Sequence, residues 1–268
     1  MSTAPVHSPM LAHTTLEPHD QADTKPDPSE YRSITGTINY MASAGCRPDV
    51  AFIAKELCRN LSNPSHMHMR AAKRCVQYLY HTRYDGLTYD RRMSGTPQAY
   101  ADADFANQLS NRRSTSGRAI MLYGAVVMWS SRQQRTVALS TAEAETSSLL
   151  DLGRDIVWLR RLLADLGTPV LHPTPALEDS RSAMKWATAS ASWSKTRHID
   201  TAFHKLREWS DDNIIKIEYC PTTNMLADCF TKALPPETHT RFKKIMLGEL
   251  YKDYYDVFNQ HQEAPAAA

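Results

Sequence analysis

The sequence has no long apolar segment and almost no net charge. A membrane-spanning helix needs about 18 or more consecutive apolar residues, and no such run occurs. The proline-rich N-terminus also lacks the basic start and apolar core of a secretory signal, so we expect an intracellular protein with no membrane partner. The formal net charge of +2 neither demands nor excludes nucleic acid, because carboxylates can mask part of a basic surface.

Paired cysteines and zinc-binding spacings are also missing. The five cysteines are odd in number and form no C-x-x-C motif, so they predict neither a disulfide framework nor a zinc knuckle. We interpret them as reduced core residues. His66 and His68 stand close together, but no further ligands follow at zinc-finger spacing, and surface histidines are the simpler interpretation.

Amino-acid composition and the positions of proline residues divide the chain into parts. With 42% hydrophobic and 22% charged residues, it is typical of a globular protein, and 268 residues suffice for two domains. Residues 1–30 are rich in proline and show no helical or alternating period, which predicts a disordered or linker arm. Residues 259–268, an Ala/Pro/Gln tail, are also predicted to be disordered.

Residues 31–92 are predicted to be helical. Pro48 and Pro64 separate three blocks, because proline disfavours helix in the residue before it. In the third block Ala71, Cys75 and Leu79 repeat at i, i+4 and i+8 and mark one buried stripe. The blocks are Tyr31–Ala44, Asp49–Leu61 and Ser65–His81.

Residues 93–235 are predicted to form an α/β domain. Three strand-like segments precede a long helix. One face of this helix begins at Glu145 and continues with apolar residues every three or four positions as far as Leu163. A strand, two helices, a strand and further helices follow, an order that indicates a mixed sheet. Residues 236–258 would be a C-terminal helical extension. The expected strands are Ala99–Phe105, Arg118–Tyr123, Ala125–Ser130, Pro175–Glu178 and Ile214–Tyr219, and the later expected helices are Ser180–Ala189, Arg197–Ser210, Thr222–Lys232 and Glu237–Leu247.

Two acids stand where apolar residues are expected. Asp102 lies in the middle of an apparent central strand, where an unpaired carboxylate is costly to bury; the alternative is an edge strand with Asp102 and Asp104 facing solvent. Glu145 lies on the apolar stripe of the long helix, where packing favours Leu or Ala; the alternative is attraction of a carboxylate to a helix N-terminus. Glu143 has a structural explanation, because Ser140 and Glu143 match a capping box.

Two further acids gain meaning only as members of an ordered set. Asp179 alone is most simply a helix N-cap, and Asp228 alone could pair with Lys232 at i+4. Together with Asp102 and Glu145 they give an acid on a first strand, one opening a long helix, one after a fourth strand and one on a late helix. Phosphodiester cleavage by two cations about 4 Å apart needs such a set of carboxylates, and magnesium prefers oxygen ligands.

These acids and the residues around them resemble the ribonuclease H domain of copia-type retrotransposon polyproteins. The segments Tyr31–Gly36, Arg47–Asp49 and Ala71–Arg74 are similar to the thumb and connection segment that precedes that domain. Thr146 and Phe105 depart from the family, which usually has tyrosine and tryptophan there. The six motifs that carry the resemblance, in family order, are Tyr100–Ala106, Arg112–Gly117, Trp129–Gln134, Ser140–Glu145, Lys195–Asp200 and Ala227–Lys232.

The resemblance implies a fold, an activity and partners. The fold would be a ribonuclease H-like five-stranded mixed sheet flanked by helices, preceded by a helical thumb and connection segment of a reverse transcriptase. Two Mg²⁺ ions, with Mn²⁺ as a substitute, would serve hydrolysis of the RNA strand of RNA/DNA hybrids during reverse transcription. The partners would be the hybrid and the rest of the polyprotein, including its polymerase palm and integrase, in cytoplasmic virus-like particles and also in the nucleus. The acids matched as catalytic and metal-binding are Asp102, Glu145, Asp179 and Asp228.

Basic residues near these motifs are candidates for contact with the hybrid. Recognition should come from 2′-hydroxyl contacts in a shallow minor groove and from phosphate contacts. Each candidate is equally well explained as a solvated loop charge, and His198 equally as a capping or surface histidine. The candidates are Arg112, Arg113, Lys195, Arg197 and His198.

Three other functions remain as alternatives. A polymerase is disfavoured, because no predicted hairpin carries two adjacent aspartates, and Ala103 separates Asp102 from Asp104. An integrase-type transferase shares the fold and the two-metal chemistry, but its glutamate comes last, whereas Glu145 precedes Asp179 here. The third is a catalytically silent, truncated or co-opted fragment that only binds nucleic acid or serves as a structural module.

Overall fold

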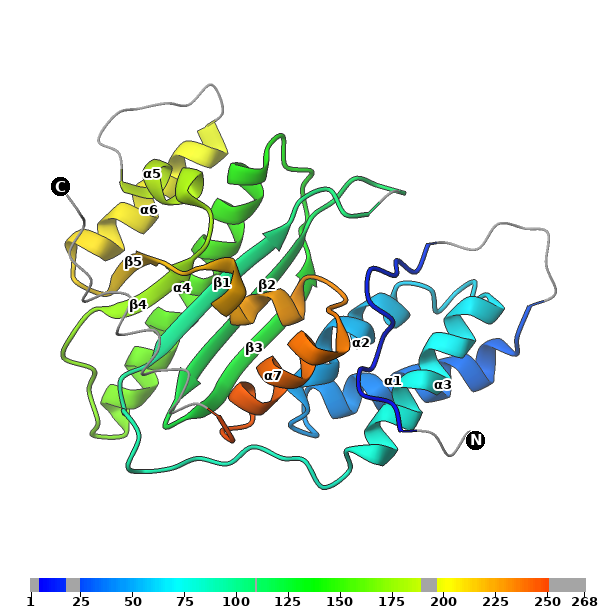
Figure 1. Cartoon of the computed structure of the whole chain (residues 1–268). Helices are drawn as coiled ribbons and strands as arrows, with labels where there is room; N and C mark the ends of the chain where they lie inside the picture. The colour runs from blue at the N-terminus through cyan, green and yellow to red at the C-terminus, as the bar shows by residue number, and fades with distance from the viewer. Residues whose placement is uncertain (1–4, 18–24, 109, 189–196, 251–268) are drawn as a thin grey trace.

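The computed structural model describes residues 5–17, 25–108, 110–188 and 197–250, with backbone alone for residues 186–188 and 197–200. A helical part and a part built on a sheet lie side by side (Figure 1). In the described residues no helix is long and apolar enough to cross a membrane.

The helical part contains the three predicted blocks. Asp27 caps α1, since its side chain accepts a hydrogen bond from the Ser29 amide at 2.9 Å. Ser65 caps α3 in the same way, through the amide of His68. Tyr31, Ile38, Leu57 and Tyr78 are almost fully buried in its core. The elements are α1 (Pro28–Ala42), the 3₁₀ turn η1 (Pro48–Val50), α2 (Ala51–Cys58) and α3 (His66–His81).

The second part is a five-stranded mixed sheet of order β3-β2-β1-β4-β5. The first three strands pair antiparallel, and β4 and β5 join them in parallel. This is the ribonuclease H-like α/β sheet that the sequence predicted, with β1 at its centre (Figure 1). The strands are β1 (Gln98–Asp104), β2 (Thr115–Leu122), β3 (Ala125–Gln133), β4 (Thr174–Glu178) and β5 (Ile215–Tyr219).

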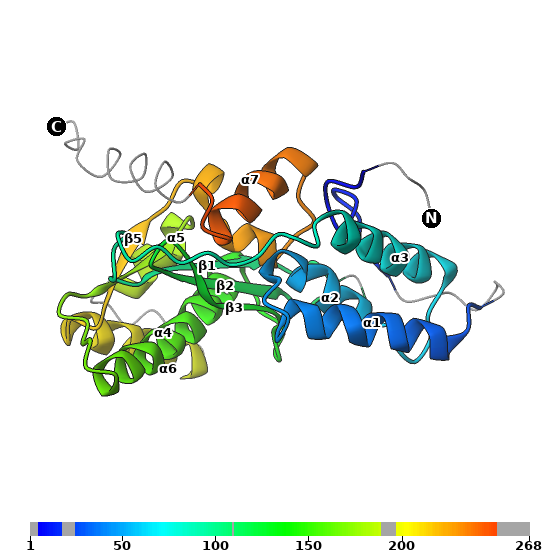
Figure 2. The ribbon, with the colours of Figure 1, turned by 90° about the horizontal axis from the view of Figure 1, so that it is seen from below.

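Helices cover both faces of the sheet. Figure 2 shows α4 (Thr141–Asp165) and α6 (Arg197–Asp211) on one side and α7 (Pro236–Met246) on the other. Successive residues of a strand point to opposite faces, so Ala99 and Ala101 pack with Leu149 and Leu152 of α4, whereas Tyr100 packs on the α7 side. The same alternation decides which acids can meet at the end of β1.

The segment Thr222–Lys232 is not the α-helix that we predicted. It forms two 3₁₀ turns, η2 (Thr222–Asn224) and η3 (Leu226–Phe230). Met225 between them is extended, with φ −74° and ψ 93°, and this interrupts the helical backbone. Asp228 therefore lies on η3. Upstream, α5 (Arg181–Thr188) forms as predicted, and α7, predicted to be an extension, buries Phe242 and Ile245 in the core beside the sheet.

Residues 5–17 pack against the rest of the chain, whereas the composition predicted a disordered or linker arm there. Met10 and Leu16 are buried in the helical core. The His13 amide donates to the Ala233 carbonyl at 3.2 Å, and the Glu17 carbonyl lies 2.8 Å from the His68 ring. Two isolated apolar residues have no period, so the sequence pattern could not reveal this packing.

Candidate functional site

Three acids meet where the parallel strands β1 and β4 end. Tyr100 pairs with Leu177 in the register of these strands, which places Asp102 and Asp179, each two residues further on, at the same edge. Glu145 lies in the second turn of α4, above that edge. One carboxylate oxygen from each of Asp102, Glu145 and Asp179 lies within 4.8 Å of the other two. The strand ends and the start of a helix thus converge at one point.

Asp102 is held from the α7 side of the sheet. Asp102 is only 4% exposed, and its strand is the central one of the sheet. The alternative of a solvent-facing edge strand is therefore wrong. Thr231 Oγ1 donates a hydrogen bond to Asp102 Oδ2. Lys232 Nζ lies 3.9 Å from the same oxygen. A buried hydroxyl and a cation therefore fix one oxygen of this carboxylate.

Glu145 lacks a partner for one of its oxygens. Its Oε2 is buried and has no hydrogen-bond partner among the described residues. Burial, followed by the charges of Glu178 and Asp102, raises the pKa of Glu145 to about 11. The helix N-terminus alone does not offset this cost, because it would lower the pKa. A divalent cation is a suitable partner for such a group, because a nearby positive charge favours the ionised carboxylate.

Glu143 has the structural task that the capping motif predicted, with one difference. Ser140 Oγ accepts a hydrogen bond from the Glu143 amide at 3.2 Å. Glu143 Oε2 accepts one from the amide of Leu139, one residue before the cap, at 2.7 Å. Glu143 thus anchors the start of α4, while Glu145 faces the acidic cluster.

Asp179 does not cap α5. Ser180 does so, because its Oγ accepts a hydrogen bond from the Ala183 amide at 3.3 Å. Asp179 Oδ2 instead accepts a hydrogen bond from Thr222 Oγ1 at 2.8 Å. Burial raises the pKa of Asp179, and the bond from Thr222 opposes that shift. The N-cap interpretation is therefore wrong, and Asp179 is available to the cluster.

Asp228 lies beside the cluster but outside the group of three. Lys232 Nζ is 2.9 Å from Asp228 Oδ1, so the predicted i+4 pair does form. The same ammonium group is 3.9 Å from Asp102, which makes the two aspartates neighbours across one cation. Burial and Asp102 raise the pKa of Asp228 to about 7, although Lys232 opposes them.

Sequence reasoning missed a fifth acid, Glu178. It is fully buried; its Oε1 accepts a hydrogen bond from the Ser180 amide at 3.1 Å, and its Oε2 has no partner among the described residues. Strand alternation puts Glu178 on the α4 side with Ala176, opposite Asp179. Burial raises its pKa well above the usual range. An acid inside the apolar run of β4 was the available signal.

The donor set fits a divalent cation. All the candidate ligands are carboxylate oxygens, which Mg²⁺ prefers. Glu145 Oε2 is buried without a hydrogen bond within the described chain, and so is Oε2 of the neighbouring acid Glu178. Lys232 already places a positive charge between Asp102 and Asp228. The site therefore has oxygen ligands for a cation, and its buried carboxylates would be stabilised by further positive charge.

The candidate nucleic-acid residues are only partly described. Arg112 and Arg113 are exposed in the loop between β1 and β2, at the end of the sheet where the acids meet. The Arg112 backbone is left-handed, with φ 55°, and its amide donates to the Gln108 carbonyl at 2.7 Å. Lys195 lies outside the described residues. Arg197 and His198 begin α6, and their side chains are not described.

Comparisons with known proteins show relatives among transposon polyproteins. The retrovirus-related Pol polyprotein from transposon TNT 1-94 of Nicotiana tabacum is 34% identical over 245 residues, 86% of this chain and 18% of that protein. The corresponding polyprotein from transposon RE2 of Arabidopsis thaliana is 30% identical over 91% of this chain and 17% of its own length. No protein-family model matches. Among solved structures, LC11-RNase H1, isolated from compost, aligns with 52% of this chain and 94% of its own, at 15% identity and a TM-score of 0.40.

The sheet topology and the acids at its edge define a domain of the ribonuclease H type. The homologues of the chain are copia-type retrotransposon Pol polyproteins. The chain spans less than a fifth of the length of either relative.

Proposed function

We propose that the chain is a metal-dependent endoribonuclease that hydrolyses the RNA strand of RNA/DNA hybrids during reverse transcription. The observation that carries this proposal is the convergence of Asp102, Glu145 and Asp179, whose oxygens lie within 4.8 Å of one another. Clusters of this kind are what two-cation phosphodiester hydrolysis needs. Buried acids that serve only the fold would be expected to have hydrogen-bond partners, and Glu145 Oε2 has none in the described part of the chain.

Each acid has a role in this proposal. Asp102, held by Thr231, would hold two Mg²⁺ or Mn²⁺ ions together with Glu145 and Asp179. Asp228 would add a further carboxylate ligand, and Lys232 would then give up its place between the two aspartates. When bound, the two cations supply an activated water and stabilise the leaving oxygen.

The substrate would lie across the end of the sheet. Arg112 and Arg113 would contact phosphates from the loop after β1, and Lys195, Arg197 and His198 would do so from the chain that leads into α6. Because the chain spans a small part of its relatives, we propose that it works beside the polymerase palm and integrase of a longer polyprotein, in cytoplasmic virus-like particles with access to the nucleus.

DNA synthesis by this chain alone is not part of the proposal. Asp211 and Asp212 are adjacent, but they lie at the end of α6 and in the turn that follows, not on a strand hairpin.

Cleavage of a labelled hybrid tests the proposal directly. The purified chain should shorten the RNA strand with Mg²⁺ and leave it intact with a chelator, and Asp102→Asn should lose the activity while keeping its circular dichroism spectrum. Asp165→Asn, which changes an exposed aspartate at the end of α4, serves as the matched control. Equal RNA breakdown by the wild type and Asp102→Asn would rule out the assignment.

A further inference from the structure

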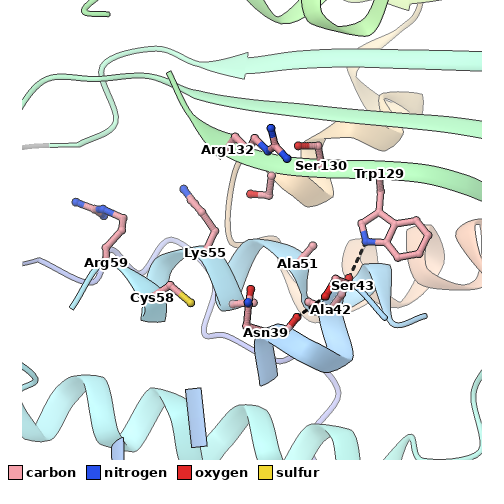
Figure 3. A pocket seen from close by; sticks show the side chains of 12 residues that line it. Asn39, Ala42, Ser43, Ala51, Lys55, Cys58, Arg59, Trp129, Ser130 and Arg132 are labelled. Carbon is pink, nitrogen blue, oxygen red and sulfur yellow. Dashed lines mark hydrogen bonds between the residues drawn. The ribbon is translucent and has the colours of Figure 1, made fainter. Parts of the chain in front are cut away.

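A groove separates the helical part from the edge strand of the sheet. It has a volume of about 540 Å³ and lies between α1 and α2 on one side and β3 on the other (Figure 3). The Trp129–Gln134 motif, which the acidic site does not use, supplies its sheet wall. The residues that line the groove are Asn39, Ala42, Ser43, Ala51, Ala54, Lys55, Cys58, Arg59, Trp129, Ser130, Ser131 and Arg132.

The charge of the groove is positive. Lys55 on α2 and Arg59, directly after α2, project into the gap, and Arg132 lies across from them on β3 (Figure 3). No carboxylate lines the groove. Glu56 pairs with Lys55 at 2.5 Å and with Arg59 at 2.9 Å. The charge of Asp104 also acts on Lys55, so two acids oppose three cations. Arg132 is exposed and forms no ion pair within the described residues.

The walls of the groove are fixed in position. Trp129 Nε1 donates a hydrogen bond to the Ala42 carbonyl at 2.7 Å and so ties β3 to the end of α1 (Figure 3). Ser131 Oγ donates to the Phe230 carbonyl at 2.6 Å. A site fixed in this way need not reorganise when it binds, which reduces the cost of binding.

The groove is also connected to the acidic site. Lys55 Nζ donates a hydrogen bond to Thr115 Oγ1 at 2.9 Å. Thr115 begins β2 directly opposite Asp104, two residues beyond Asp102 on β1. A polymer that runs from the acidic site over the start of β2 would therefore reach Lys55 first. Arg59 and Arg132 would lie further along the same path.

We propose that this groove holds the sugar-phosphate backbone of one strand of the nucleic acid that is cut at the acidic site. Its cations would contact successive phosphates, and its serine hydroxyls and small apolar side chains would face the sugars. The choice of an RNA/DNA hybrid rests on the proposed function, whereas the choice of a polyanionic strand rests on the charge and position of the groove alone.

Salt-dependent binding of a fluorescein-labelled 18-base-pair RNA/DNA hybrid tests the proposal. Chelator prevents cleavage, and anisotropy gives Kd between 50 and 300 mM salt for the wild type, Arg59→Gln, Arg132→Gln and the double variant. Each lost phosphate contact should lower the slope of log K against log salt by about one and raise Kd roughly five- to tenfold at 0.1 M salt. Arg161→Gln, an exposed arginine on α4 outside the groove, should match the wild type.

Two further results separate this proposal from the nuclease assignment. With Mg²⁺, the groove variants should raise KM for the hybrid and leave kcat within about twofold. Groove variants with wild-type slopes and KM would overturn the groove proposal while cleavage by the wild type stands. Weaker, less salt-dependent binding by these variants without cleavage by the wild type would support the groove and overturn the nuclease.

Discussion

Thr231 donates a hydrogen bond from its hydroxyl to Asp102 Oδ2, although 129 residues separate the two along the chain. This bond joins η3 to the central strand and fixes one oxygen of the carboxylate at the middle of the acidic site. Thr231 itself is fully buried. Hydrogen bonds to charged groups contribute about 1.5–3 kcal/mol, so the orientation of Asp102 depends substantially on this one hydroxyl.

Replacing Thr231 should therefore impair cleavage without removing an acid. Thr231→Val keeps the side-chain volume but removes the donor, and residues that orient metal ligands typically change activity or metal affinity about 10- to 100-fold. We expect a loss in kcat/KM in that range and weaker Mg²⁺ activation, measured from initial rates over a Mg²⁺ titration. Thr231→Ser keeps the donor and should retain most of the activity. Equal activity of the Val and Ser variants would contradict this role.

Glu143 and Glu145 should respond differently to the same substitution. Glu145→Gln removes a charge from the acidic cluster and should abolish cleavage as Asp102→Asn does. Glu143→Gln weakens the hydrogen bond to the Leu139 amide and should cost about 0.5–1 kcal/mol of the free energy of unfolding, with cleavage largely retained. Hybrid cleavage and urea unfolding of both variants check the pair. If the two variants exchange these behaviours, the assignment of the two glutamates is wrong.

Divalent cations should stabilise the protein more at pH 8 than at pH 6. The pKa of Glu145 is raised to about 11 and that of Asp228 to about 7, so in the metal-free protein their contribution to stability falls as the pH rises from about 4 through those values. A bound cation must displace the proton from Glu145, which becomes easier at higher pH. Thermal melts with and without Mg²⁺ at both pH values should show the larger gain in Tm at pH 8. Glu145→Gln should reduce that gain.

Glu178→Gln should stabilise the metal-free protein. The fully buried carboxyl has a strongly raised pKa, so its contribution to stability is present below about pH 4.5 and declines as the pH rises. An amide of nearly the same shape carries no such cost and can still accept the hydrogen bond from the Ser180 amide. We expect a higher free energy of unfolding at pH 8 and little change at pH 4.5, measured with urea in the presence of a chelator. A loss of stability at both pH values would refute this explanation.

His239 should make the fold sensitive to mild acid. Burial lowers its pKa, against the opposing effect of Asp49, while Lys243 and Arg47 add to the lowering. Since the folded pKa lies below the unfolded value of about 6.5, the stability it contributes is present above pH 6.5 and is lost as the pH falls. The difference in unfolding free energy between the wild type and His239→Gln should shrink from pH 7.5 to pH 5.5. A difference that stays constant with pH would contradict this prediction.

The sequence predicted the parts of the fold and site where one residue breaks a pattern. Asp102 in a central strand and Glu145 on an apolar stripe were recognisable because acids do not belong there. Glu178 escaped notice because it adjoins Asp179 at the end of a strand, although the alternation of side chains along a strand already places these two neighbours on opposite faces of the sheet.

Features that depend on distant segments could not be predicted in this way. The residues Thr222–Lys232 have a helical composition, but the extended backbone at Met225 interrupts the helix. The groove combines side chains from α1, α2 and β3, whose separation in sequence hides their proximity. The packing of Met10 and Leu16 likewise depends on a surface that α1 to α3 form only once the chain has folded.

The bond from Trp129 to the Ala42 carbonyl has a practical consequence for expression of the chain. Ala51 packs against the apolar clusters of both the helical part and the sheet part, so each part buries apolar surface of the other. A shortened protein that starts after His81 would lack the helices that pack against β3, the edge strand of the sheet. Such an edge invites pairing between molecules, and the sheet part produced by itself is expected to precipitate unless the preceding helices accompany it.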